Sequence, residues 1–458
     1  MLLPRKRAYN PTNFQQQSKH KTKASLMDGA FAFTNETKPQ WEKADFWREV
    51  LPSLTVSDDD EGFIPPGNRA VCKPRAVHRD AASSLRRQRL IEDGYVLSND
   101  MKGSSELVEK LRDAISALHQ KKIPASFVLM YDETWRLARM ANRVLSKATH
   151  PLNVFNFDLL AWHIDAKENR AGFSPHRDRQ PDDTSSSFHV DGQAKYVTMW
   201  MALSEATPEN SCLYVIPRPH DPGYSQGDTD EDPLSRALPT KESYQNIRAL
   251  PRRAGEAVLF THRILHWGSR GNAQSSLAPN DPRVAISFVA SAPSFEQPYI
   301  DSNYFPTDGE RLPPFRIRLL LVCAQLLIYY QRFDLPKSFI RACYDHCKAH
   351  GDDLDPAYKK KVMVEFVKAM KETSEGATKS LVNCNDDNDD KDEDAVLEEM
   401  LEAEAGGYGD FHDDFDGLDG AEPTEHDDDD DGFEDNEEDG GIDALFAKQN
   451  ASKKRKLG

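Results

Sequence analysis

The chain has 458 residues, of which 38% are hydrophobic and 9% aromatic, which is enough for a sizeable core in one large domain with extensions or in two or three domains. Its net charge of −18 is unevenly spread: residues 386–439 hold 28 Asp and Glu against one Lys, which leaves 57 Lys and Arg against 48 Asp and Glu elsewhere. Six scattered cysteines, a start without an apolar segment and no apolar run of about 20 residues argue against a disulfide scaffold, a secreted precursor and a membrane helix. We therefore expect an intracellular protein with a mildly basic body and an acidic tail.

The first part of the chain is polar and contains prolines, so we expect residues 1–83 to form a loosely ordered extension with one short amphipathic segment at 41–51. The pattern tightens from Ser84 onward, where apolar residues begin to recur at spacings of three and four. The elements predicted next are a helix over 85–91, a strand over 94–97, and helices over 104–121 and 126–148.

The periodicity then changes to that of β-strands, in short runs bounded by Pro, Gly, Asn or Asp. The predicted strands are 154–165, 196–203, 212–216, 257–261 and 284–290. No helical run of ordinary length separates them, which favours an antiparallel sandwich or barrel over a parallel sheet. Helices are predicted again over 315–333, 336–350 and 356–373.

These patterns divide the chain into an extension (1–83), a sheet-bearing domain (84–310), a helical segment (311–380) and an acidic tail (381–458). The tail has too few aliphatic residues to offset the entropy of ordering, so we expect it to be disordered. Residues 453–456 (Lys-Lys-Arg-Lys) and 5–7 (Arg-Lys-Arg) are typical of nuclear-localisation signals, although charged termini have the same composition. They favour the nucleus over the cytoplasm, and the tail predicts binding to basic proteins. No nucleic-acid-binding motif is present.

Three His-x-Asp pairs are candidates for two of the three ligands that a non-haem iron oxygenase requires. Residues two apart on a strand point the same way, so this spacing places both side chains on one face. The pairs are His163/Asp165, His176/Asp178 and His189/Asp191. The first extends an apolar strand, the third precedes a glycine turn, and the second lies in a polar segment punctuated by Gly and Pro.

The third ligand must come from a distant strand, and the stretch 255–272 offers both His262 and His266. Arg283 follows at the head of another predicted strand. Its planar guanidinium suits the distal carboxylate of 2-oxoglutarate, whereas a surface charge at a strand end is the alternative reading.

From about residue 90 to 288, these motifs together resemble the phytanoyl-CoA dioxygenase family of Fe(II)/2-oxoglutarate oxygenases. The chain shows the family's opening Asp93-Gly94-Tyr95, a first iron motif at His176-Arg177-Asp178, and landmarks at 198–203 and 206–220. Its last motif matches His266, Gly268, Ser269, Asn272 and Arg283. Departures from the usual pattern are Ser211, Arg218-Pro219 and an inserted Trp267, which keeps His262 open as an alternative to His266.

The resemblance implies an α+β fold built on a double-stranded β-helix, a jelly roll of cupin type, flanked by helices. It implies iron held by His176, Asp178 and His266, with Arg283 fixing 2-oxoglutarate, which is converted to succinate and CO2 as an unidentified substrate is hydroxylated. Trp200 would line the co-substrate pocket, unless it is simply a core tryptophan. The alternative function is a non-catalytic scaffold whose tail binds basic nuclear partners such as histones.

Two further patterns resemble metal sites. Residues 427–438 have the spacing of an EF-hand calcium loop, but neither flank carries a helical apolar face, and a run of aspartates produces such a match readily. Cys343, His346, Cys347 and His350 have helical spacing and could bind zinc, although neighbouring apolar residues favour a packing helix.

Overall fold

The computed structural model describes residues 40–58 and 80–378, apart from 102–103, 169–171, 180–183, 229–231, 270, 273, 275–281, 307–309 and 334. The basic clusters at both ends, the acidic tail and the EF-hand-like stretch lie outside the described residues. The described part mixes helices with two antiparallel sheets, in agreement with the predicted fold class at that level.

The larger sheet has the strand order β1-β7-β4-β9-β2, and β3 also pairs with β9. Its strands are β1 (Tyr95–Ser98), β2 (Val154–Phe155), β3 (Leu160–Ile164), β4 (Tyr196–Ala202), β7 (Ala257–Thr261) and β9 (Arg283–Ser291). All residues of β4, β7 and β9 are buried, because both faces of the sheet are covered. The smaller sheet, in the order β6-β5-β8, consists of β6 (Arg248–Leu250), β5 (Leu213–Ile216) and β8 (Leu265–Gly268).

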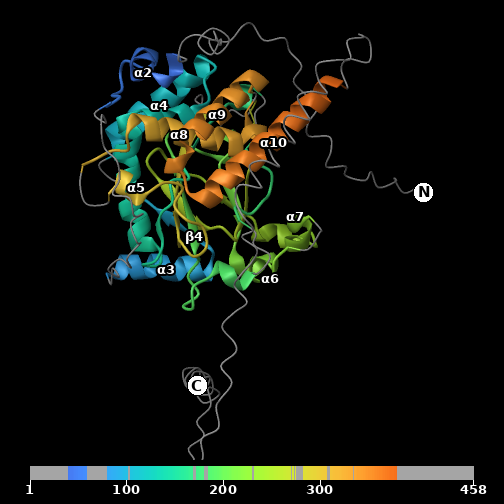
Figure 1. Cartoon of the computed structure of the whole chain (residues 1–458). Coiled ribbons are helices and arrows are strands. Elements are labelled where there is room, and N and C mark those ends of the chain that lie inside the picture. Colours follow the sequence, from blue (N-terminus) through green and yellow to red (C-terminus); the bar gives the residue numbers. More distant parts are fainter. Residues whose placement is uncertain are drawn as a thin grey trace, which may run out of the picture. The chain divides into compact units, whose positions relative to one another are not determined.

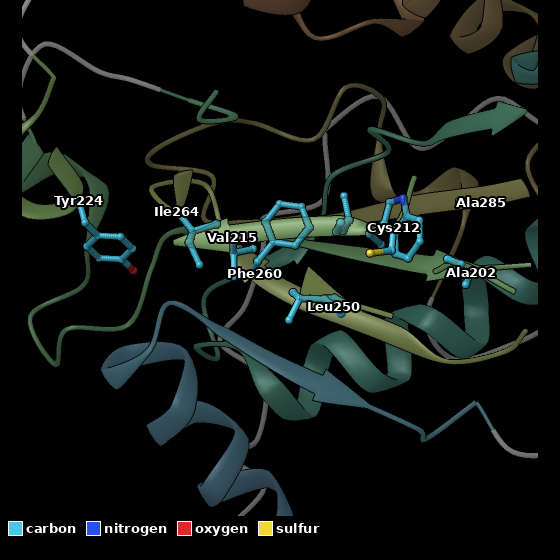
Figure 2. Packing of buried hydrophobic residues seen from close by; sticks show 12 residues of the cluster. Ala202, Cys212, Val215, Tyr224, Leu250, Phe260, Ile264 and Ala285 are labelled. Atoms are coloured by element: carbon cyan, nitrogen blue, oxygen red, sulfur yellow. The ribbon is translucent and has the colours of Figure 1, made fainter. Parts of the chain in front are cut away.

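A hydrophobic core lies where the two sheets contribute side chains to one cluster (Figure 2). Phe260 and Ala285 come from the larger sheet, and Val215 and Leu250 from the smaller one. All four are less than 5% exposed. This packing fixes the two sheets relative to each other and so sets the distance between residues carried by β8 and by β9.

Helices cover the other face of the larger sheet. Both α4 (Ser105–Gln120) and α5 (Asp132–Ala148) contact β9, and α8 (Phe315–Ile328) packs on α9 (Lys337–His350) and α10 (Pro356–Thr378). In Figure 1 these helices gather on one side of β4, away from the short α6 (Gly223–Gln226) and α7 (Pro233–Ala237). Helix α3 (Ala81–Glu92) precedes β1. None of the described helices combines the length and the apolar character that a membrane crossing requires.

The structure differs from the expected pattern between β2 and β3, where one strand was predicted over 154–165. Phe157 adopts a left-handed conformation with φ of 73° and interrupts the strand. This break directs Asp158, which is 3% exposed, into the interior. There its carboxylate accepts hydrogen bonds at 3.1–3.2 Å from the hydroxyl groups of Tyr196, Tyr299 and Tyr329.

A second difference concerns residues 40–58, which belong to the stretch expected to be loosely ordered. Helix α2 (Ala44–Val50) and the preceding turn bury Trp41 and Trp47 completely, and the Trp47 ring stacks on Phe127 at 4.6 Å. The helix predicted over 126–148 divides at Tyr131 into a 3-10 helix, η3 (Ala125–Met130), and α5. At this break the Asp132 amide donates to the Thr55 carbonyl, so the N-terminal segment docks there.

Candidate metal centre

Two segments far apart in sequence form the candidate metal centre, because residues 172–178 run antiparallel beside β8. The amide of His176 donates to the carbonyl of His266, and the reverse bond is also made, both at 3.0 Å. Gly172 and Gly268 allow this approach: a Cβ on Gly268 would lie 2.8 Å from the Gly172 Cα. Backbone pairing therefore places the two histidines side by side, with ring centroids 4.4 Å apart.

Asp178 completes a group of three possible ligands with His176 and His266, whose donor atoms all lie within 4.8 Å of one another. Asp178 Oδ1 is 3.7 Å from His176 Nε2 and 3.5 Å from His266 Nε2. Within the described part of the chain, this is the one group of three His, Cys, Asp or Glu side chains that could hold a metal ion.

The hydrogen bonds around these residues leave the right atoms for a metal. His176 Nδ1 lies 2.7 Å from the Ser174 carbonyl and His266 Nδ1 lies 3.2 Å from the Ile264 carbonyl. A proton on each Nδ1 satisfies these carbonyls and leaves the Nε2 lone pairs facing Asp178 Oδ1. The other carboxylate oxygen, Oδ2, accepts a hydrogen bond from Thr198 at 2.7 Å. Two imidazoles and a carboxylate are a donor set that suits ferrous iron.

Burial and charge also favour the metal-binding protonation states. Burial lowers the pKa of His266 to about 4, so its imidazole is neutral at pH 7. Burial opposes ionisation of Asp178, but attraction to His266 and His176 and the bond from Thr198 outweigh it and lower its pKa. The centre therefore presents an anionic carboxylate and, in His266, a neutral nitrogen donor.

Arg283 and Trp200 line the same cavity as these three side chains. Arg283 is 2% exposed, lies 5.5 Å above the Trp200 ring, and its Nε has no hydrogen-bond partner in the described structure. Burial lowers the pKa of the guanidinium to about 10, which still leaves it charged at pH 7. A buried cation that forms no ion pair with any described residue fits an anionic ligand, and 2-oxoglutarate provides a carboxylate for it.

The structure places the alternative histidines elsewhere. His163, on β3, stacks on His119 at 3.9 Å, and His189 stacks on His150 at 3.7 Å, with its Nε2 2.9 Å from Asn153 Oδ1. His262 is buried with Nδ1 3.0 Å from the Tyr196 carbonyl, and burial lowers its pKa to about 4. None of these three belongs to the described group of possible metal ligands.

The possible zinc ligands on α9 do not form such a group either, within the residues described. Cys343 and Cys347 are buried, and His346 Nδ1 lies 3.3 Å from a Glu42 oxygen. Burial also raises the pKa of the Cys347 thiol well above its usual value, which disfavours the thiolate that binds zinc. This part of α9 serves packing.

The sequence did not reveal several residues that shape the centre. Thr198 lies in an apolar strand, where nothing predicts a contact with Asp178, although period-2 alternation in β4 places it on the same face as Trp200. Tyr329 and Arg332 line the cavity from beyond the end of α8, more than 60 residues after the last ligand, and carry no motif.

Residues 106–276 match the profile of the family described as phytanoyl-CoA dioxygenase (PhyH), which confirms the predicted family and, with it, the class of non-haem iron, 2-oxoglutarate-dependent oxygenases. Arg283 lies just beyond the matched residues. No curated protein matches the chain.

The similarity of the chain to solved structures is weaker. The epimerase SnoN in complex with Fe3+, alpha ketoglutarate and nogalamycin RO is 22% identical with a TM-score of 0.35, over 46% of this chain and 84% of SnoN. HygX from Streptomyces hygroscopicus, with nickel and 2-oxoglutarate bound, is 13% identical with a TM-score of 0.34, over 49% and 90% of the two chains. Both scores are below 0.5, so the assignment rests on the family match and on the geometry of the centre.

Proposed function

We propose that this chain, whose residues 106–276 form a domain of the phytanoyl-CoA dioxygenase family, hydroxylates an organic substrate with Fe(II), O2 and 2-oxoglutarate, releasing succinate and CO2. The fold proposed for it is the double-stranded β-helix, or cupin-type jelly roll, in which the two antiparallel sheets face each other. The observation that carries the proposal is one cavity lined both by three convergent ligand side chains and by a buried arginine that forms no ion pair in the described structure.

Each residue has a distinct task in this proposal. His176, Asp178 and His266 would hold iron through two Nε2 atoms and one carboxylate oxygen. Thr198 fixes the orientation of Asp178 through its 2.7 Å hydrogen bond, and the Ser174 and Ile264 carbonyls fix the imidazole rings. Bound iron with 2-oxoglutarate supplies the oxidising chemistry for the insertion of one oxygen atom into a C–H bond.

Arg283 would bind the distal carboxylate of 2-oxoglutarate, with the Trp200 ring beneath its guanidinium. Arg283 belongs to β9, whereas the metal ligands belong to β8 and to residues 172–178. The packing of the two sheets therefore sets the distance that one molecule of 2-oxoglutarate must span between the metal and Arg283. Arg283 is 2% exposed, and its attraction for a carboxylate is stronger in such buried surroundings than in bulk water.

The test is anaerobic titration of the purified protein with Fe(II) in the presence of 2-oxoglutarate, followed by a succinate assay in air. His176→Ala, Asp178→Ala and His266→Ala should abolish the iron–2-oxoglutarate charge-transfer absorption and succinate release. His163→Ala and His189→Ala are matched controls that should retain both. A wild-type protein that binds iron but releases no succinate would support the scaffold alternative, and loss of the band in His189→Ala with retention in His176→Ala would refute the proposed ligands.

A further inference from the structure

Four arginines line the cavity that contains the candidate metal centre: Arg177, Arg179, Arg283 and Arg332. An arginine in such a position either balances a carboxylate of the protein or remains available for an anion that enters from solution. The hydrogen-bond partners of the four arginines indicate which of them can bind an anion that enters the cavity.

Arg177 and Arg179 flank Asp178 in sequence, and both are neutralised by the protein itself. The Arg177 side chain is fully buried between two carboxylates, with bonds of 2.7–2.9 Å to Asp221 and to Asp228. Arg179 donates to the Glu296 carboxylate at 2.7 and 3.1 Å, and its Nη2 lies 3.3 Å from Asp158 Oδ2. Neither guanidinium is available to a ligand.

Arg332 differs from this pair in its surroundings. It ends the 3-10 helix η10 (Tyr330–Arg332) and is exposed at the cavity, with its guanidinium 4.3 Å from the centroid of the Phe173 ring and 4.6 Å from that of Tyr329. Its side chain makes no hydrogen bond or ion pair with any residue that the structure describes. Two aromatic faces therefore hold the cation in place while its N–H donors remain available.

The aromatic residues that hold Arg332 are themselves fixed. The Tyr329 hydroxyl donates to the buried Asp158 carboxylate at 3.1 Å, and the Phe173 ring packs edge-on against Trp162 at 5.7 Å. Phe173 also contacts the His176 ring at 5.9 Å, so the same side chain touches a proposed iron ligand and Arg332. A cation held by such rigid neighbours needs little reorganisation to bind an anion.

We propose that Arg332 binds the anionic group, a carboxylate or a phosphate, of the primary substrate, whose apolar part lies against Phe173. This inference rests on the proposed function, because it assigns Arg283 to 2-oxoglutarate and leaves Arg332 as the cation for the second organic molecule. The substrate class is then an amphipathic acid or phosphate ester rather than a neutral or cationic compound.

The test uses three probes of equal chain length, hexanoate, hexyl phosphate and the neutral hexanamide, added to the anaerobic wild-type Fe(II)–2-oxoglutarate complex. Binding is measured as a change in the charge-transfer absorption. We expect at least one of the two anions to bind and hexanamide not to bind. Arg332→Gln should weaken binding of the anion about tenfold, the lower end for a hydrogen bond to a charged group because the residue is exposed, and Arg332→Lys by less.

Arg136→Gln removes an exposed arginine of α5 that does not line the cavity, and should bind the anion as the wild type does. Failure of both anions to bind the wild type, equal binding of hexanamide, or unchanged anion affinity in Arg332→Gln would overturn the inference. If the proposed function itself fails, the wild type shows no charge-transfer absorption before any probe is added, or it releases no succinate in air. The two failures are therefore distinguishable.

Discussion

Arg283 and Arg318 are two equally buried arginines for which the structure predicts opposite effects of replacement on stability. Arg283 is 2% exposed and forms no ion pair with a described residue, whereas Arg318 is 1% exposed and bonds Asp132 at 2.6 Å. A buried charge without a counter-charge costs free energy in the folded protein. Arg283→Met should therefore leave the unfolding free energy of the ligand-free protein unchanged or raise it.

Arg318→Met leaves the Asp132 carboxylate buried without its cation, at 4% side-chain exposure. Removal of one partner of a buried pair costs roughly 3–5 kcal/mol. Urea unfolding of the ligand-free proteins should therefore show a much lower transition midpoint for Arg318→Met than for Arg283→Met. Arg318→Met also removes hydrogen bonds from the guanidinium to the carbonyls of Pro313 and Met130 and to the Ser57 hydroxyl, so the comparison contrasts a fully partnered buried guanidinium with one that forms no ion pair with a described residue.

The two variants should differ in the opposite sense in the stabilisation that 2-oxoglutarate adds, with the larger increment in Arg318→Met. Loss of a charged hydrogen-bond partner costs about 1.5–3 kcal/mol, or about 10- to 150-fold in affinity. With anaerobic Fe(II) and 2-oxoglutarate at about 100 times its wild-type Kd, ligand binding stabilises the wild type by about 2.7 kcal/mol, and Arg283→Met by only about 0.3–1.4 kcal/mol. Arg318→Met should keep the wild-type increment. Equal destabilisation of both ligand-free variants, or a full ligand increment in Arg283→Met, would refute this reasoning.

Two further predictions concern His189, which lies outside the centre, and Gly268, which lies beside it. Burial and the adjacent His150 lower the pKa of His189 to about 4, so between pH 6.5 and 4 the unfolded chain binds a proton that the folded protein does not, and stability falls as the pH drops through this window. Urea titrations from pH 7 to pH 4.5 should show that the unfolding free energy of His189→Gln falls less steeply with decreasing pH than that of the wild type. The same pH dependence in both proteins would show that His189 does not cause the loss of stability. Gly268→Ala places a Cβ 2.8 Å from the Gly172 Cα and should weaken Fe(II) binding about 10- to 100-fold by separating His176 from β8. Wild-type iron affinity in a folded Gly268→Ala protein would show that the segments tolerate a wider spacing.

Local periodicity was sufficient to predict most helices and the long buried strands, because these elements carry their pattern within their own residues. Strand β6 has three residues and β8 has four, too few to show a period, and both are strands only through pairing with β5. The break at Phe157 depends on a backbone conformation that an aromatic residue rarely adopts, so no sequence rule indicates it.

The site shows the same division between local and distant causes. The His-x-Asp spacing and the order of motifs singled out His176, Asp178, His266 and Arg283, and the structure brings all four to one cavity. Arg177 and Arg179 flank Asp178 in sequence, but their carboxylate partners, which include Asp221, Glu296 and Asp158, lie 21 to 117 residues away along the chain. Only the tertiary structure shows which arginines are already neutralised.

The docking of residues 40–58 has a consequence for the order in which the chain folds. The Ser57 hydroxyl accepts a hydrogen bond from Arg318, a contact that spans 261 positions, and both Thr55 and Ser57 bond carboxylates at the start of α5. During synthesis the first described residues therefore emerge long before their partners on α8 and α9. Trp41 and Trp47 stay without their complete burial site until translation has passed α9, whose Phe339 packs on Trp41 at 6.1 Å. Closure of so long a loop makes the N-terminal segment a late step in folding and leaves two large aromatic side chains open to chaperones or to aggregation in the nascent chain.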